Sequence, residues 1–240
     1  MLLKKILKRI LLVGLSLVLI LAAASVFVYS RYLHPAGEIM PGLYAVRNDR
    51  NGVPMVNFFI IQADDGKYIA IDAGSDNEQT INALERLAIS ADDIAAVFLT
   101  QTSFDHVTGI HLFHNAVLYS WDTDFRYIEA SPFSPFTSSS FIPPDIPHYT
   151  MADGEIIELY GRTVQGIHTP GDATDSMAFL VDGRYLFVGN LFLALNGAQQ
   201  CSELQALSRE NVLAIDSVEY VFTGHFGLFK DVRFFRWWWL

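Results

Sequence analysis

The chain has 240 residues, of which 51% are hydrophobic, and this length suits one domain of roughly 200 residues plus a short additional segment. Its net charge is −10, with 26 Asp and Glu against 16 Lys and Arg. A surface of this sign repels phosphate polyanions, which argues against nucleic acid as substrate or partner but not against a small ligand. The single cysteine, Cys201, excludes an internal disulfide, so the fold depends on core burial.

The additional segment lies at the N-terminus, where basic residues precede an apolar run. The basic residues are Lys4, Lys5, Lys8 and Arg9. Residues 10–29 then carry no charge, and Arg31 follows. A helix of this length reaches about 30 Å, the thickness of a bilayer's hydrocarbon core, and its 13 Leu, Ile, Val and Phe residues favour insertion by about 6 kcal/mol in total. Residues 1–32 are therefore predicted to form a transmembrane anchor.

A cleaved signal peptide is the alternative interpretation of this segment. Residues 22–24 are all alanine and form an A-x-A-like cleavage site, whereas residues 26–28 continue the apolar run as a retained anchor would. In both interpretations the positive-inside rule keeps the basic residues in the cytoplasm and exports the rest of the chain. We therefore expect a single-pass membrane protein with an extracytoplasmic domain, or an exported soluble protein if the segment is cleaved.

Short β-rich runs follow the N-terminal segment. Strands are predicted over residues 42–46, 56–63 and 68–72, with a hairpin turn at residues 64–66. A helix is predicted over residues 77–89, because Ile81, Leu84, Leu87 and Ala88 share one face. A buried strand over residues 95–100 and a short helix after Asp105 complete this half.

The second half begins with a segment rich in Ser, Pro and Phe, residues 121–147, which has no periodicity and is predicted to be a loop that acts as a lid. Strands are then predicted over residues 155–160, 163–168, 176–181, 185–188 and 218–222, and a helix over residues 202–213 with Ser202 as N-cap. The aromatic tail, residues 234–240, either packs on the domain or lies in a membrane interface.

The most informative segment, residues 100–109, reads TQTSFDHVTG and follows a predicted strand. Residues 72–74 upstream read DAG, and residues 169–172, 187–190 and 223–225 downstream read TPGD, FVGN and TGH. In this order the segments resemble the metallo-β-lactamase superfamily, whose signature is THxHxDHxxG with a D-x-G turn before it and TPGH, FxGD and GH after it. The resemblance covers residues 42–227. It implies a four-layer αββα sandwich of mixed α/β class, expected over residues 38–240, with two metal ions at one edge between the sheets.

The resemblance also implies a ligand set. Three His of the family hold the first metal, and this chain has Gln101, Ser103 and Asp172 at those positions. The ligands of the second metal match Asp105, His106 and His225. An Asp that bridges both metals matches Asn190. The first metal's ligands are thus replaced, while the second metal's set is complete.

The residues at the two metal positions differ in how strongly they bind Zn²⁺. An amide oxygen or a neutral hydroxyl is a weak ligand for Zn²⁺, so the first site is expected to be empty. Two His and one carboxylate with an open position form a catalytic type of site, so one Zn²⁺ is predicted, with Mn²⁺ or no metal as alternatives. Another alternative is an oxygen-rich pocket for Mn²⁺, Mg²⁺ or Ca²⁺ formed by Gln101, Ser103, Asp105, Asp172 and Asn190. Asp105 and Asp172 are the candidate catalytic residues, and either Asp172 or a metal-bound hydroxide is expected to serve as base.

Structural roles are the competing interpretation of several of these residues. Asp105 and His106 serve in that case only to hydrogen-bond the loop and begin the next helix, with Asp105 as its N-cap. His168, at the end of a predicted strand, is expected to be structural. His111 and His114 are expected to lie on a helix that leads away from the site.

Two functions are compatible with this pattern. The first is a membrane-anchored hydrolase that uses one metal ion to cleave a small ester, lactone, amide or phosphoester. The alternative is an inactive relative, a pseudoenzyme that binds a small ligand or an unidentified protein partner. The fold by itself does not choose between them.

Protease treatment of intact cells tests the predicted topology. We expect an external protease to degrade the part of the chain that follows residue 32, because the basic residues retain the N-terminus inside. Immunoblotting against the C-terminal domain measures this, with lysed cells as the control for susceptibility. A domain that is cleaved only after lysis would contradict the prediction.

Overall fold

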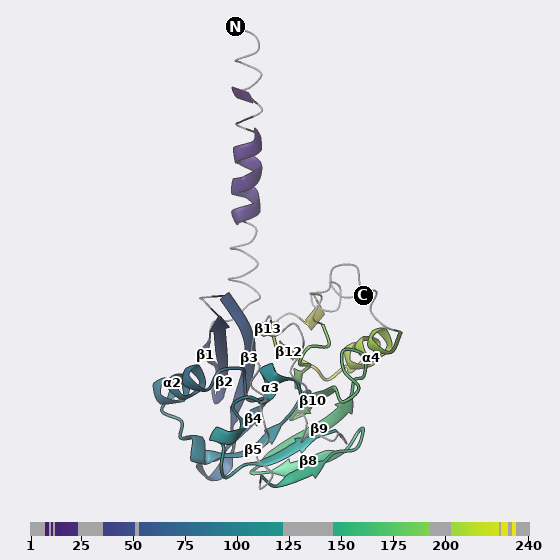
Figure 1. Ribbon diagram of the computed structural model, residues 1–240. Coiled ribbons are helices and arrows are strands. Elements are labelled where there is room, and N and C mark those ends of the chain that lie inside the picture. Colours follow the sequence, from purple (N-terminus) through teal and green to yellow (C-terminus); the bar gives the residue numbers. More distant parts are fainter. Residues whose placement is uncertain are drawn as a thin grey trace. The chain divides into compact units, whose positions relative to one another are not determined.

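The computed structural model describes residues 8–9, 11, 13–23, 36–50, 53–121, 146–192, 203–225, 227–229 and 232–233 (Figure 1). The chain divides into two compact units, Met1–His34 and Pro35–Leu240. In the first unit, residues 13–23 are helical. No helix among the described residues is both long and apolar enough to cross a membrane. Parts of several predicted features lie outside these residues: positions 10, 12 and 24–29 of the predicted span, residues 122–145 of the predicted lid, Cys201, Ser202 and the tail.

The second unit is built on two β-sheets. In the first sheet, the described strands follow the order β1 to β7: β1 (Gly37–Met40), β2 (Leu43–Arg50), β3 (Val53–Gln62), β4 (Tyr68–Ile71), β5 (Ile94–Phe98), β6 (Val117–Ser120) and β7 (His148–Thr150). Strands β1 to β4 are antiparallel, whereas β4 to β7 run parallel. The carboxyl ends of β4 and β5 therefore meet at the same edge.

The second sheet has the order β13-β12-β11-β10-β9-β8. Its strands are β8 (Ile156–Leu159), β9 (Arg162–His168), β10 (Met177–Val181), β11 (Tyr185–Phe187), β12 (Tyr220–Thr223) and β13 (Gly227–Phe229). Only β11 and β12 among these neighbours are parallel. These two strands therefore also end at one edge, as β4 and β5 do in the first sheet.

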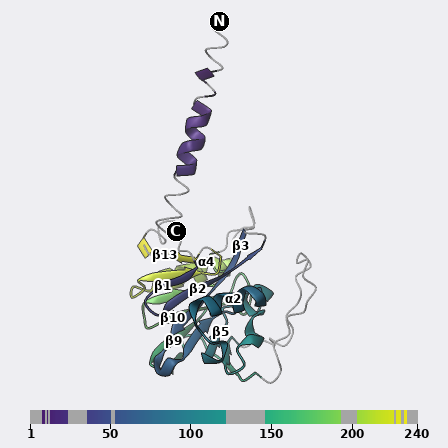
Figure 2. The ribbon, with the colours of Figure 1, turned by 90° about the vertical axis from the view of Figure 1, so that its left-hand side faces the viewer.

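Helices cover the outer faces of the sheets (Figures 1 and 2). The α-helices of this unit are α2 (Asn77–Leu87), α3 (Phe104–Val107) and α4 (Glu203–Leu213), and the short 3-10 helices are η1 (Asp64–Gly66), η2 (Ala91–Asp93) and η3 (Ile110–Leu112). One buried cluster joins α2 to the first sheet, a second fills the space between the sheets, and a third joins the second sheet to α4. The predicted four-layer αββα architecture is confirmed.

Aromatic side chains make the contact between the sheets. Phe59 of the first sheet lies 5.3 Å from Phe187 and 5.2 Å from Phe222, measured between ring centroids. Phe98 at the end of β5 lies 4.5 Å from Tyr119 and 5.3 Å from Phe179. Because Phe98 lies just before the loop of the TQTSFDHVTG segment, this packing fixes the point from which that loop starts.

The structure corrects two details of the helix predictions. Ile81 is 43% exposed, whereas Thr80, Ala83 and Leu84 are buried. The buried face of α2 is therefore rotated relative to the predicted apolar face. The small side chain of Ala83 packs in the cluster against the sheet, and Thr80 accepts a 3.5 Å hydrogen bond from Asn48. Asp105 is also not an N-cap: α3 begins at Phe104, with Ser103 at the N-cap position and Asp105 in its first turn.

The strands β1, β6, β7 and β13 have no counterpart in the sequence prediction. Each has only three or four residues. Runs of this length show little alternation of apolar and polar residues, so only some of them, such as β4 and β11, are predicted. The other strands agree with their predicted positions to within a few residues at the ends.

Replacing Phe98 tests the packing between the sheets. Phe98→Ala removes a fully buried ring, so we expect the free energy of unfolding to fall by about 4 kcal/mol. Ile156→Ala is the control, because Ile156 is 58% exposed, and it should cost less than about 1 kcal/mol. Denaturant unfolding of the purified chain measures both values, and equal losses would contradict the role assigned to Phe98.

Candidate metal centre

The motif residues follow the ends of strands. Asp72 directly follows β4, and the TQTSFDHVTG loop follows β5. Asn190 and His225 follow the parallel strands β11 and β12, and Asp172 follows β9. Parallel neighbours end at one edge, so segments far apart in the sequence are brought together there.

The buried carboxylate of Asp72 organises this edge. Thr100 donates its backbone N–H to Asp72 Oδ1 at 2.7 Å and its hydroxyl to Oδ2 at 2.7 Å. His106 Nδ1 lies 2.8 Å from the same Oδ2. Since an ionised carboxylate only accepts hydrogen bonds, Nδ1 carries the hydrogen and donates it. The other ring nitrogen, Nε2, is thereby turned toward the site.

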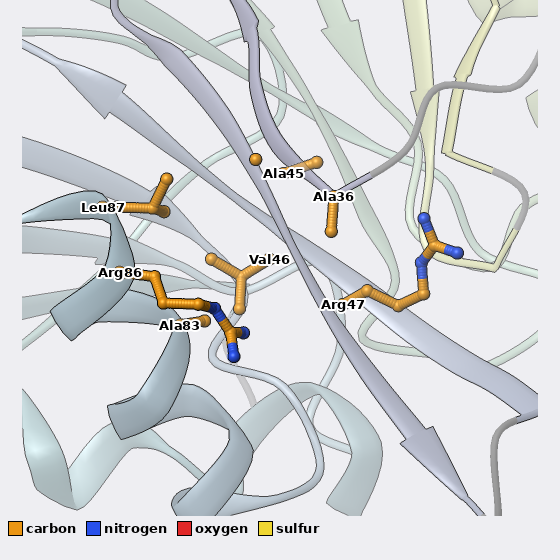
Figure 3. A pocket seen from close by; sticks show the side chains of 8 residues that line it. Ala36, Ala45, Val46, Arg47, Ala83, Arg86 and Leu87 are labelled. Carbon is orange, nitrogen blue, oxygen red and sulfur yellow. The ribbon is translucent and has the colours of Figure 1, made fainter.

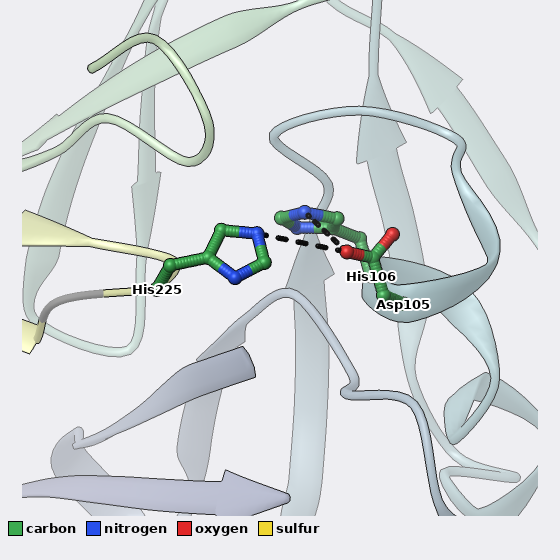
Figure 4. A group of neighbouring side chains, drawn as sticks. All are labelled: Asp105, His106 and His225. Carbon is green, nitrogen blue, oxygen red and sulfur yellow. Dashed lines mark ion pairs between the residues drawn. The ribbon is translucent and has the colours of Figure 1, made fainter. Parts of the chain in front are cut away.

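Asp105, His106 and His225 lie together (Figure 4). Oδ2 of Asp105 lies 3.7 Å from His106 Nε2 and 3.7 Å from His225 Nε2. Two ligands bound tetrahedrally to one Zn²⁺ at about 2.1 Å are about 3.4 Å apart, so these separations fit a single ion. His106 Nε2 is also buried and has no hydrogen-bond partner. The donor set and its geometry are those of a site for one divalent cation.

The charges of the site favour a cation. Burial lowers the pKa of His106, but the carboxylates of Asp72 and Asp105 raise it more strongly, and the pKa reaches about 9. Burial raises the pKa of Asp105, but His106, Ser103 and His225 together lower it below its ordinary value. The positive charge of protonated His106 balances the carboxylates of Asp72 and Asp105. A metal ion that bound to His106 would displace this proton.

Hydrogen bonds connect Gln101 and Ser103, two of the three positions at which the resemblance places first-metal ligands, to Asp105. Gln101 Nε2 donates to Ser103 Oγ at 2.6 Å, and Ser103 Oγ donates to Asp105 Oδ1 at 2.7 Å. Among the residues that the structure describes, no second group of His, Cys, Asp or Glu has metal-ligating geometry. The residues present therefore fit one ion and not two.

Asp172 and Asn190 lie beside the three residues. Burial raises the pKa of Asp172, while the charge of His106 and a hydrogen bond with Asn190 oppose that rise. Asn190 is buried, and a Cβ atom at Gly224 would lie 3.2 Å from its Oδ1 and 3.3 Å from His106 Cε1. Asp172 as a residue is exposed to solvent, so the site includes an accessible carboxylate that belongs to no ligand group.

The remaining histidines lie outside the group. His111 and His114 are exposed, on and just after the 3-10 helix η3. His168 ends β9, stacks on Trp121 with ring centroids 3.7 Å apart, and has its Nε2 2.9 Å from Thr174 O. These contacts are those of a structural residue.

Two site contacts escaped the sequence analysis. One is the bond between Asp72 and His106, although the D-x-G turn itself was the available signal. The other is Asp175, whose Oδ2 accepts from Thr102 N at 2.8 Å and from Thr102 Oγ1 at 2.6 Å, thereby tying the motif loop to the loop of Asp172. No local pattern marks Asp175.

A cavity of about 340 Å³ lies away from this centre, lined by Ala36, Gly37, Ala45, Val46, Arg47, Ala83, Arg86 and Leu87. Figure 3 shows that the guanidinium groups of Arg47 and Arg86, which line this cavity, lie apart from each other. None of the motif residues lines this cavity.

Comparison with known proteins agrees with the fold and the motif. The model of the metallo-beta-lactamase superfamily matches residues 51–199. The chain belongs to this superfamily. It is 28% identical over 128 residues to the lactamase-like protein adaB of Aspergillus niger, a match that covers 52% of this chain and 36% of that protein. The chain thus aligns with little more than a third of its superfamily relative.

Solved structures of the superfamily show the same fold. A metallo-beta-lactamase family protein from Thermus thermophilus has a TM-score of 0.64 and 20% identity, over 82% of this chain and 77% of that one. MEM-A1, a subclass B3 metallo-beta-lactamase from a soil metagenome library, has a TM-score of 0.60 and 20% identity, over 82% and 80%. The metallo-beta-lactamase of Cronobacter sakazakii with a HARLDQ motif has a TM-score of 0.59 and 19% identity, over 78% of each chain.

Replacing Asp72 with Asn tests the contact that holds His106. Asp72 has a φ of 65°, which Asn also tolerates, so the substitution removes charge without adding backbone strain. Breaking a buried pair leaves a charge uncompensated, so we expect the free energy of unfolding of the metal-free protein to fall by about 3 kcal/mol at pH 7.

Asp65→Asn is the matched control, because Asp65 has a φ of 58° and is exposed. It should change the free energy of unfolding by less than about 0.5 kcal/mol. Denaturant unfolding of both variants measures the difference, and a neutral Asp72→Asn would show that the contact contributes nothing to stability.

Proposed function

We propose that this protein is a hydrolase that depends on one divalent cation held by Asp105, His106 and His225. The observation that carries the proposal is that both Nε2 atoms lie 3.7 Å from one oxygen of Asp105. Two imidazoles and one carboxylate leave a coordination position open, as catalytic zinc sites do. Zn²⁺ suits this donor set, and Mn²⁺ is the alternative ion.

The residues around the three ligands have distinct tasks. Asp72 fixes the tautomer of His106, so that Nε2 presents its lone pair once the proton is released. A divalent cation supplies Lewis acidity when bound there, which acidifies water and stabilises negative charge on a carbonyl or phosphoryl oxygen. Asp172 acts as general base: burial raises its pKa, and a carboxylate with a raised pKa accepts a proton more readily. The hydrogen bond with Asn190 holds Asp172 in place.

This chemistry points to small substrates with a hydrolysable carbonyl or phosphoryl group, namely esters, lactones, amides or phosphoesters. The proposed location is the outer side of the cytoplasmic membrane, with the N-terminal segment as anchor, or free in that compartment if the segment is cleaved. The basic residues before the apolar run support this orientation. The acidic composition supports a small-molecule substrate over a nucleic acid.

One observation favours a second candidate function, a pseudoenzyme that binds a ligand or a protein partner. Gln101 donates a hydrogen bond to Ser103, and Ser103 donates one to Asp105, where the family's first metal ion would bind. A protein that has lost one ion and retained the fold is suited to binding without turnover.

A hydrolysis assay with a matched histidine control separates the two functions. The purified protein is tested against generic carboxylic ester, lactone, amide and phosphoester substrates with added Zn²⁺ or Mn²⁺. We expect activity in the wild type and in His114→Ala, which alters an exposed histidine. We expect His225→Ala to fall to the rate without protein, because it removes one of three ligands.

The bound metal is measured in the same samples by elemental analysis. Metal binding without hydrolysis of any substrate would favour the pseudoenzyme. Hydrolysis that survives in His225→Ala would contradict the proposed site.

A further inference from the structure

We infer that Gln101 and Ser103 are positioning residues, which orient Asp105 for a single ion and exclude a second one. This inference rests on the proposed metal dependence and extends it to residues outside the ligand set. It comes from the chain of hydrogen bonds that joins the three side chains.

The donor and the acceptor of each hydrogen bond in this series follow from the chemistry of the side chains. The amide nitrogen of Gln101 can only donate, so Ser103 Oγ accepts that hydrogen bond at 2.6 Å. The hydroxyl proton of Ser103 is then directed to Asp105 Oδ1, 2.7 Å away. Gln101 is only 4% exposed, so water does not readily replace a lost bond. The carboxylate thus receives a donor in a fixed direction.

The two oxygens of Asp105 therefore have different partners. Oδ1 is occupied by Ser103, whereas Oδ2 is the atom 3.7 Å from both imidazoles. A ligand held by an outer hydrogen bond loses less freedom when the ion binds, and such outer partners typically change metal affinity about 10-fold to 100-fold. Ser103 is therefore expected to strengthen metal binding without touching the ion.

The same bonds disfavour a second ion. An ion at the positions of Gln101 and Ser103 would have to break both hydrogen bonds of the chain. In return it would gain, beside the carboxylate of Asp172, only an amide oxygen and a neutral hydroxyl, which are weak ligands for Zn²⁺. The expected stoichiometry is one ion per chain.

Calorimetric titration of the metal-free full-length protein with Zn²⁺ tests the inference. Ser103→Ala should raise the Kd about 10-fold to 100-fold, because Asp105 loses its donor. Ser103→Thr keeps the hydroxyl and should stay within about 3-fold of the wild type, since the outer partner is retained. Ser90→Ala is the control for removal of a serine hydroxyl outside the hydrogen-bond series, at an exposed turn, and should leave the Kd unchanged.

The outcomes separate this inference from the proposed function. Three results would each overturn the positioning role but not the proposed function. They are an unchanged Zn²⁺ affinity in Ser103→Ala, a loss of affinity in Ser103→Thr equal to that in Ser103→Ala, and two tightly bound ions in the wild type. The expected affinities without hydrolysis of any substrate would overturn only the proposed hydrolase. A wild type that binds no Zn²⁺ or Mn²⁺ would overturn both.

Discussion

The site depends on one buried interaction, the contact of Asp72 with Thr100 and His106. A carboxylate is costly to bury unless hydrogen bonds satisfy it, and here two donors from Thr100 and one from His106 do so. The same oxygens link the ends of β4 and β5 and orient an imidazole. Stability and the orientation of a candidate ligand therefore rest on the same atoms, and a change that weakens one weakens the other.

The sandwich brings the two halves of the site together. Asp105 and His106 lie in helix α3, which follows β5 of the first sheet, whereas Asn190 and His225 follow strands of the second sheet. The backbone N–H of Asn57 in β3 donates to Gly224 O at 2.5 Å, which ties the residue before His225 to the first sheet. Together with the aromatic contacts of Phe59 and Phe98, this bond sets the distance between ligands that lie more than 100 residues apart.

Gln101 and Ser103 stand where the superfamily resemblance implies ligands of a first metal, and the structure gives these two residues other partners. Coordination bonds at the first-metal positions are replaced by hydrogen bonds among Gln101, Ser103 and Asp105, so that buried polar groups keep partners. Asp172 is left beside the remaining ligands as a carboxylate that no ion is required to neutralise. This arrangement suits a general base in a hydrolase, and the same polar groups equally suit ligand binding in a pseudoenzyme.

The sequence by itself determined the superfamily, the αββα architecture and the identity of the three residues, Asp105, His106 and His225, that the structure brings together as a candidate metal group. Short motifs such as DAG and TGH, taken in their order along the chain, carry that information. Each motif forms the turn that directly follows a strand, so its residue types mark where that strand ends. Only the tertiary structure decided that Asp72 holds His106, that Asp105 lies inside α3, and that Gln101 bonds to Ser103, which in turn bonds to Asp105. These contacts depend on the direction in which each side chain points and on packing between distant segments. Neither periodicity nor spacing along the chain specifies them.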